Sequence, residues 1–136
     1  MATYGISISD SGIKLANSVS TGAVSGTLYT VPALAYAHLV FARIEGSQTT
    51  NAGIVNNIQL KSADGDVIST FVTYTSPGGA SVISSNIELP NYTSATAFRW
   101  PIILTAGQTV TYVGGSLTGG GQARNVDWYV EIVEFS

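Results

Sequence analysis

The stretch VDWYVEIVEF, Val126 to Phe135, decides the fold class because its apolar residues recur at every second position. One set of alternate residues is apolar: Val126, Trp128, Val130 and Ile132. The residues between them are polar or amphipathic: Asp127, Tyr129 and Glu131. A period of two is that of a β-strand, whose side chains point alternately to opposite faces of a sheet. The stretch therefore predicts a long strand that buries one face and leaves the other half exposed.

A second alternating run, IVNNIQLK, leads into a predicted hairpin that extends from Ile54 to Thr75. Its expected inward residues are Ile54, Ile58 and Leu60, and its expected outward residues are Asn57, Gln59 and Lys61. The following run, DVISTFVTYT, is rich in β-branched and aromatic residues, which favour strands. Asp64–Gly65 between the two runs is typical of a type I′ turn, in which both central residues need a positive φ.

Three further runs predict strands in the second half of the chain: SVISSNIEL, AFRWPIIL and QTVTYVG. In the second run, alternate residues share one face: Phe98, Trp100, Ile102 and Leu104. Pro101 has no N–H for a sheet ladder, so it is expected at a sheet edge or a bulge.

The fold class predicted from this spacing is all-β. Turn signals at intervals of roughly ten residues divide the chain into about eight to ten antiparallel strands, which is typical of a β-sandwich or jelly roll. Residues 1–25 are rich in Ser, Gly and Thr and less regularly patterned, so they are expected to form an N-terminal arm or a short strand pair. Residues 26–136 are expected to form the β-sandwich domain.

Composition excludes several classes of function. The 136 residues carry a net charge of −3, and only 10% of them are charged, which is well below the usual ~25%. No basic stripe is present to bind phosphates, so nucleic acid is not an expected partner. No apolar run is long enough for a membrane-spanning helix, and the N-terminal sequence does not resemble a secretory signal. The chain contains no cysteine, which excludes disulfides and thiolate metal sites.

The sequence gives little support for catalysis. His38 is the only histidine, no Gly-x-Ser-x-Gly motif accompanies it, and it lies in an apolar run, so a structural or interface role is expected. The eight carboxylates show no arrangement that identifies a glycosidase pair. The segment Asp64 to Asp66 fits a turn better than a calcium loop, because Thr75 stands where an EF-hand requires Glu. We expect no catalytic residue, no metal site and no cofactor.

Interaction with a partner is better supported. Seven tyrosines and two tryptophans stand beside few charges, and both residue types combine large contact area with a polar tip. The candidate interface residues are Tyr4, Tyr29, Tyr129 and Arg124. Tyr129 alternates with Trp128 on the last predicted strand, so one of these two rings points away from the core.

Three motifs carry a resemblance to a known family: LYTVPA at Leu28 to Ala33, LTAGQTVTYVGG at Leu104 to Gly115, and the closing VDWYVEIVEF. Their content and order resemble those of small β-sandwich virion proteins of tailed bacteriophages. In that family the first motif enters a strand and the second forms a turn before a late strand. The chain departs from the pattern at Leu34 and Ala35, where the family often has Gly-Lys.

The resemblance implies a non-enzymatic virion component, located in the virion and assembled in the host cytoplasm. It implies a homotrimer whose partner is the major capsid protein or another virion protein, most simply as a capsid decoration (cement) protein. The alternative is a tail or fibre module that binds a host surface glycan, with the loop from Val113 to Arg124 as the candidate site. An enzyme is the least supported of the three hypotheses.

Overall fold

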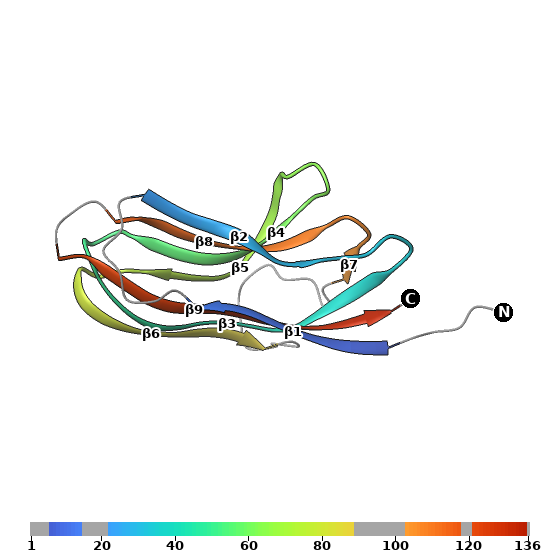
Figure 1. Ribbon diagram of the computed structural model, residues 1–136, viewed down its shortest axis with the longest axis horizontal. Helices are drawn as coiled ribbons and strands as arrows, with labels where there is room; N and C mark the ends of the chain where they lie inside the picture. The colour runs from blue at the N-terminus through green and yellow to red at the C-terminus, as the bar shows by residue number, and fades with distance from the viewer. Residues whose placement is uncertain (1–5, 15–21, 89–102, 118–120, 136) are drawn as a thin grey trace.

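A computed structural model describes residues 6–14, 22–88, 103–117 and 121–135. These residues form nine strands and no helix: β1 (Ile6–Lys14), β2 (Gly22–Thr30), β3 (Tyr36–Thr50), β4 (Val55–Lys61), β5 (Val67–Thr75), β6 (Gly79–Glu88), β7 (Ile103–Thr105), β8 (Thr109–Leu117) and β9 (Ala123–Phe135). The strands build two antiparallel sheets that lie face to face (Figure 1). The all-β prediction is confirmed.

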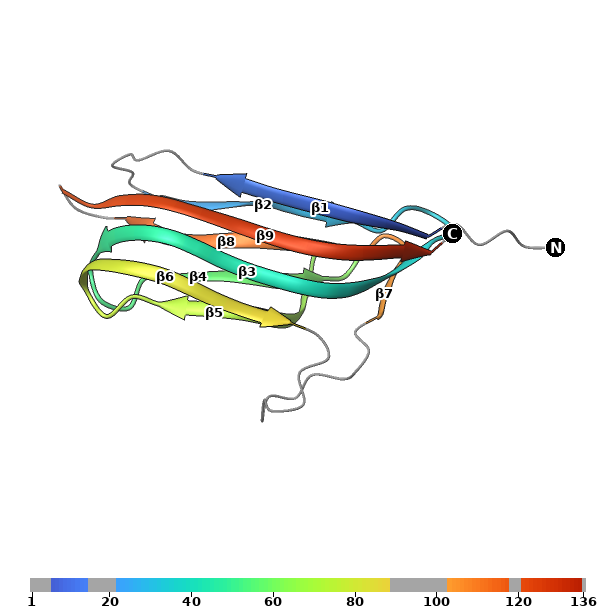
Figure 2. The same cartoon turned by 90° about the horizontal axis from the view of Figure 1, so that it is seen from below.

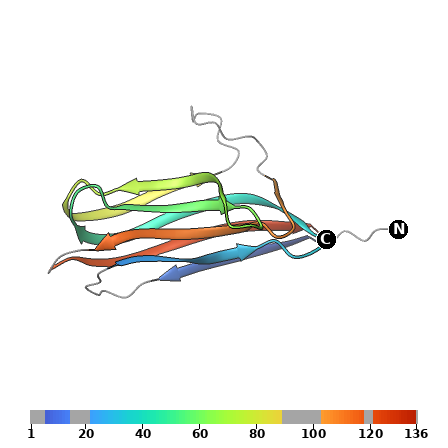
Figure 3. The same ribbon diagram turned by 90° about the horizontal axis from the view of Figure 1, so that it is seen from above.

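The strand pairing is that of a jelly roll. Four pairs nest along the chain, β1 with β9, β2 with β8, β3 with β6, and β4 with β5, as in one long hairpin wound around itself. One sheet has the order β1-β9-β3-β6 with short β7 paired to β3, and Figure 2 shows this sheet from below. The other sheet has the order β2-β8-β4-β5 and is seen from above in Figure 3.

The first two strands belong to different sheets. β1 pairs with β9 along its whole length, from Ile6 opposite Phe135 to Lys14 opposite Asp127. β2 pairs with β8 in the other sheet. The boundary expected after residue 25 falls inside β2, and the division of the chain into arm and sandwich domain stays a prediction.

The core lies between the sheets and contains the residues that the alternation of β9 placed inward. Val126, Trp128, Val130 and Ile132 are all essentially inaccessible to solvent. The Trp128 ring packs on that of Tyr112 from β8, with ring centroids 5.0 Å apart, so the large aromatic side chains join the two layers. Leu39 and Ile44 from β3, Ile58 from β4 and Leu104 from β7 complete the same cluster.

The hairpin expected between Ile54 and Thr75 is present as β4 and β5, with Ile58 and Leu60 buried. The type I′ turn was a wrong prediction. The connection runs from Ser62 to Asp66, and the Ser62 N–H donates to the Asp66 carbonyl at 2.8 Å. Within it only Gly65, with φ of 92°, has a positive φ, because the longer loop needs a single left-handed residue before the chain reverses.

The two turn motifs of the resemblance meet at one end of the sandwich. The Val31 N–H donates to the Gln108 carbonyl and the Gly107 N–H donates to the Val31 carbonyl, each at 3.0 Å. Leu34 takes a left-handed conformation, with φ of 63°, and is 98% exposed. β3 begins two residues later at Tyr36. The expected strand residues Phe98, Trp100, Pro101 and Ile102 lie outside the described residues.

Candidate interaction surface

The outer face of the five-stranded sheet carries a row of aromatic side chains from β3 and β9. We define this aromatic face by Tyr36, His38, Phe41, Arg43, Tyr129 and Phe135. All six are half-buried or exposed, whereas Ala37, Ala42, Ile44, Trp128 and Val130 next to them in the chain are buried. The strand register brings them together: Tyr36 lies opposite Phe135, and Arg43 lies opposite Tyr129. A β-bulge between Leu39 and Phe41 keeps the residues on both sides of it on the same face.

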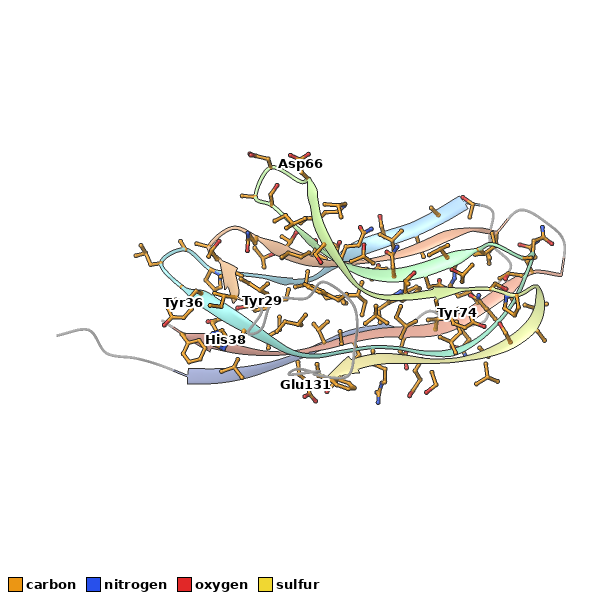
Figure 4. The ribbon with its side chains drawn as sticks, turned by 180° about the vertical axis from the view of Figure 1, so that it is seen from behind. Tyr29, Tyr36, His38, Asp66, Tyr74 and Glu131 are labelled. Carbon is orange, nitrogen blue, oxygen red and sulfur yellow. The ribbon has the colours of Figure 1, made fainter. Side chains whose placement is uncertain are left out.

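The first ring cluster lies where β3 begins and β9 ends. The rings of Tyr36 and Phe135 are stacked, with centroids 5.2 Å apart. The His38 ring meets Phe135 edge-on at 4.9 Å. Ile103 of β7 is the register partner of His38 and is about half exposed, which extends the apolar surface. Figure 4 shows Tyr36 and His38 side by side at this end of the molecule.

The second ring cluster, Phe41 and Tyr129, lies beside the guanidinium group of Arg43 on the same face. The Cζ of Arg43 lies 5.1 Å from the ring centroid of Tyr129 and 5.9 Å from that of Phe41. Both distances fall within the range of cation–π attraction. Arg43 Nε also lies 3.5 Å from a carboxylate oxygen of Glu45, and the Tyr129 hydroxyl donates to Glu131 Oε1 at 2.8 Å.

The outer face of this sheet is acidic. Glu45, Asp127 and Glu131 lie on it beside Arg43. These four side chains carry three negative charges and one positive charge, a net of −2.

Tyr29, a predicted interface residue, joins the two sheets. Its hydroxyl donates to Glu134 Oε2 at 2.5 Å, from β2 in one sheet to β9 in the other. Burial, together with the hydrogen bond to the Glu134 carboxylate and its charge, raises the pKa of Tyr29 well above its usual value. The Tyr29 hydroxyl is thus engaged in a hydrogen bond within the chain.

Arg124, also predicted at the interface, lies between the sheets and is only 2% exposed. Its Nη2 donates to the Gly115 carbonyl at 2.5 Å, and its Nε has no hydrogen-bond partner among the described residues. Burial lowers the pKa of this guanidinium. Gln48, its register partner on β3, accepts a hydrogen bond of 2.9 Å from Asn56 Nδ2 on β4. Arg124 thus belongs to a buried polar layer rather than to the surface of a single chain.

Of the four predicted interface residues, only Tyr129 is part of the aromatic face; Tyr4 lies outside the described residues. The sequence analysis did not single out Tyr36, Phe41, Arg43 or Phe135. Alternation along β9 was the available signal for Phe135, whereas the bulge in β3 interrupts the alternation there. Within the ranges that the structure describes, no group of three His, Cys, Asp or Glu residues is placed to hold a metal ion. None of the described segments is a helix long and apolar enough to cross a membrane.

Comparisons with known proteins identify no family. No protein-family model matches the chain, and no curated protein matches it. Among solved structures, a chain from the structure of infectious bursal disease virus, Gx strain, matches with 14% sequence identity and a TM-score of 0.34. The match covers 96% of this chain and 32% of that chain, so this protein spans about a third of its length. At that TM-score the likeness has no weight for function.

Proposed function

We propose that this chain is a non-enzymatic structural protein of a tailed-bacteriophage virion that binds another virion protein through its aromatic face, as a capsid decoration protein. The observation that carries the proposal is the aromatic face itself. Two ring clusters lie on the outer face of one sheet, and Arg43 lies beside both rings of the second cluster. Tyr, Phe and Arg are the residue types that dominate the centres of protein interfaces.

The topology is compatible with this role. Jelly rolls occur in viral capsid domains as well as in lectins and cupins, so the fold favours no single function. The two turn motifs that carry the family resemblance hydrogen-bond to each other through Val31, Gly107 and Gln108. The two motifs therefore form one connected turn region at this end of the sandwich.

A structural role also agrees with how the polar groups are used. His38 packs against Phe135, Tyr29 donates to Glu134, and Asp64 and Asp66 lie in an exposed hairpin turn. His38 and Tyr29 therefore make contacts within the fold, and the two carboxylates lie apart from them in the turn. We further propose that the working form is a homotrimer in the virion, as the resemblance implies.

Co-sedimentation with capsids that lack this protein tests the proposal. The wild-type chain is expected to pellet with capsids, and Tyr36→Ser and Phe41→Ser are each expected to weaken binding about tenfold, as for residues near an interface centre. Ile68→Ser is the matched control, because Ile68 is exposed on the opposite sheet. Absence of wild-type binding, or equal weakening by the control, would contradict the proposal.

The second candidate function is binding of a host surface glycan by a tail or fibre module. Lectins share the jelly-roll fold, which is the observation in its favour. Its predicted site, the loop from Val113 to Arg124, includes residues 118–120 outside the described ranges and ends at the buried Arg124. A glycan array probed with the folded protein separates the two candidates: specific glycan signals without capsid binding would favour the second.

A further inference from the structure

We infer that the partner bound by the aromatic face is a different protein whose docking surface is basic, with Lys or Arg side chains set among apolar groups. The inference rests on the proposed function for the location of the interface, and it adds the chemistry of the partner. It follows from the charge of the face, from the way its rings already hold a cation, and from the placement of the chain's own basic residues.

The charge is concentrated on one surface. Among the side chains that the structure describes, three of the six carboxylates occupy the outer face of the five-stranded sheet, against one of the three cations. Outside this face, Asp64 and Asp66 lie in the hairpin turn and Glu134 is bonded to Tyr29. A surface of net negative charge attracts basic partners and repels nucleic acid and anionic lipid, so complementarity favours a cationic protein surface.

The rings on this face are suited to cations as well as to apolar groups. Arg43 shows the arrangement within the chain, because its guanidinium approaches the Tyr129 and Phe41 rings while its Nε faces Glu45. An incoming Lys or Arg meets the same combination of aromatic rings and carboxylates. Glu45, which is about half exposed, offers one such carboxylate.

A second copy of this chain is a poor complement to the face. Two copies placed face to face would oppose net charges of −2 and −2, which is unfavourable. Besides Arg43, the chain has only four Lys and Arg residues, and one of them, Arg124, is buried. Another copy of the chain therefore presents few positive charges to this surface. A different protein is the better partner for the aromatic face.

Two double variants with the same net charge test the inference. Glu45→Gln with Asp127→Asn removes two charges from the face, and Asp64→Asn with Asp66→Asn removes two charges from the exposed hairpin turn. In capsid co-sedimentation, the face variant is expected to bind about tenfold more weakly and the turn variant within about twofold of wild type. Wild-type binding is expected to weaken as salt rises from about 0.05 M to 0.5 M, because salt screens exposed charges.

An NMR titration, independent of capsids, uses the acetylated and amidated peptide Arg-Leu-Arg-Leu, with Gln-Leu-Gln-Leu as its neutral control. We expect the basic peptide, and not the neutral one, to change the amide chemical shifts of β3 and β9. These changes should be smaller in the face variant. Capsid binding that is unchanged by salt and by the face variant would overturn the inference and leave the proposed function intact. Binding of the basic peptide without any capsid binding would support the inference and contradict the proposed function. Absence of peptide binding and of capsid binding would contradict the inference and the proposed function.

Discussion

At the scale of single residues, Arg124 is a buried charge whose loss the fold should tolerate. It is 2% exposed, and no carboxylate of the described residues forms a salt bridge with it. Arg124→Met keeps an unbranched apolar chain in this space and removes a desolvated charge, which offsets the loss of the bond to the Gly115 carbonyl. We expect the free energy of unfolding to be unchanged or about 1 kcal/mol higher.

Urea denaturation measures this effect, with Arg124→Ala as the comparison. The Ala variant is expected to lose about 2 kcal/mol, because it leaves the space beside Gly114 unfilled. A Met variant as unstable as the Ala variant would mean that the hydrogen bond to Gly115 outweighs the cost of burying the charge.

Gly46 is expected to tolerate no side chain. A Cβ there would lie 2.1 Å from the Asn125 carbonyl oxygen, and its φ of 139° is one that L side chains rarely adopt. Gly46→Ala should therefore lower the free energy of unfolding by about 3 kcal/mol or more, because steric overlap adds to backbone strain. Gly53→Ala is the control, since Gly53 has a φ of 88° but nothing within 4 Å of the added carbon. Its expected cost in thermal denaturation is about 1 kcal/mol, from backbone strain alone.

At the scale of elements, Tyr29 links β2 to β9 and makes this connection sensitive to alkaline pH. Its pKa is raised in the folded chain, mainly by burial and then by Glu134. Folding thus favours the neutral hydroxyl. Its contribution to the free energy of unfolding is fully present below the unfolded pKa of about 10 and is lost as pH rises beyond that value. Unfolding of wild type between pH 7 and 11 should show this loss. The Tyr29→Phe variant should not show this loss of stability. An identical alkaline loss in wild type and variant would contradict the role given to the Tyr29 hydroxyl.

The strands that the sequence predicted best are those with local alternation. The parity of β9 identified its buried residues, and the same parity places Arg124 with Val126 and Trp128 on the inner face. The alternation therefore predicts an inward Arg124, as the structure shows. On β3 the parity changes, because Tyr36 and His38 share the outer face with Phe41 and Arg43 only through the bulge after Leu39. No local pattern marks a bulge, so the aromatic face was not predictable as a unit.

At the scale of the whole molecule, the jelly-roll topology depends on pairings between distant segments. Ile6 lies opposite Phe135, at the other end of the chain, and no local pattern in either segment specifies its partner. Spacing and turn residues therefore predicted the number and type of strands. They left the sheet order open, and with it the concentration of carboxylates on one face.

The distribution of charge also predicts how copies of the chain assemble. Because the described side chains on the outer face of the five-stranded sheet carry a net charge of −2, contacts within the proposed trimer should avoid it. Light scattering coupled to size exclusion is therefore expected to give a trimer mass for wild type, for Phe41→Ser and for the variant with Glu45→Gln and Asp127→Asn. The mass should also stay constant between low and high salt, since no like-charged surfaces are brought together. A trimer that appears only at high salt, or only when Glu45 and Asp127 are neutralised, would place this face inside the oligomer and contradict its assignment to a different partner.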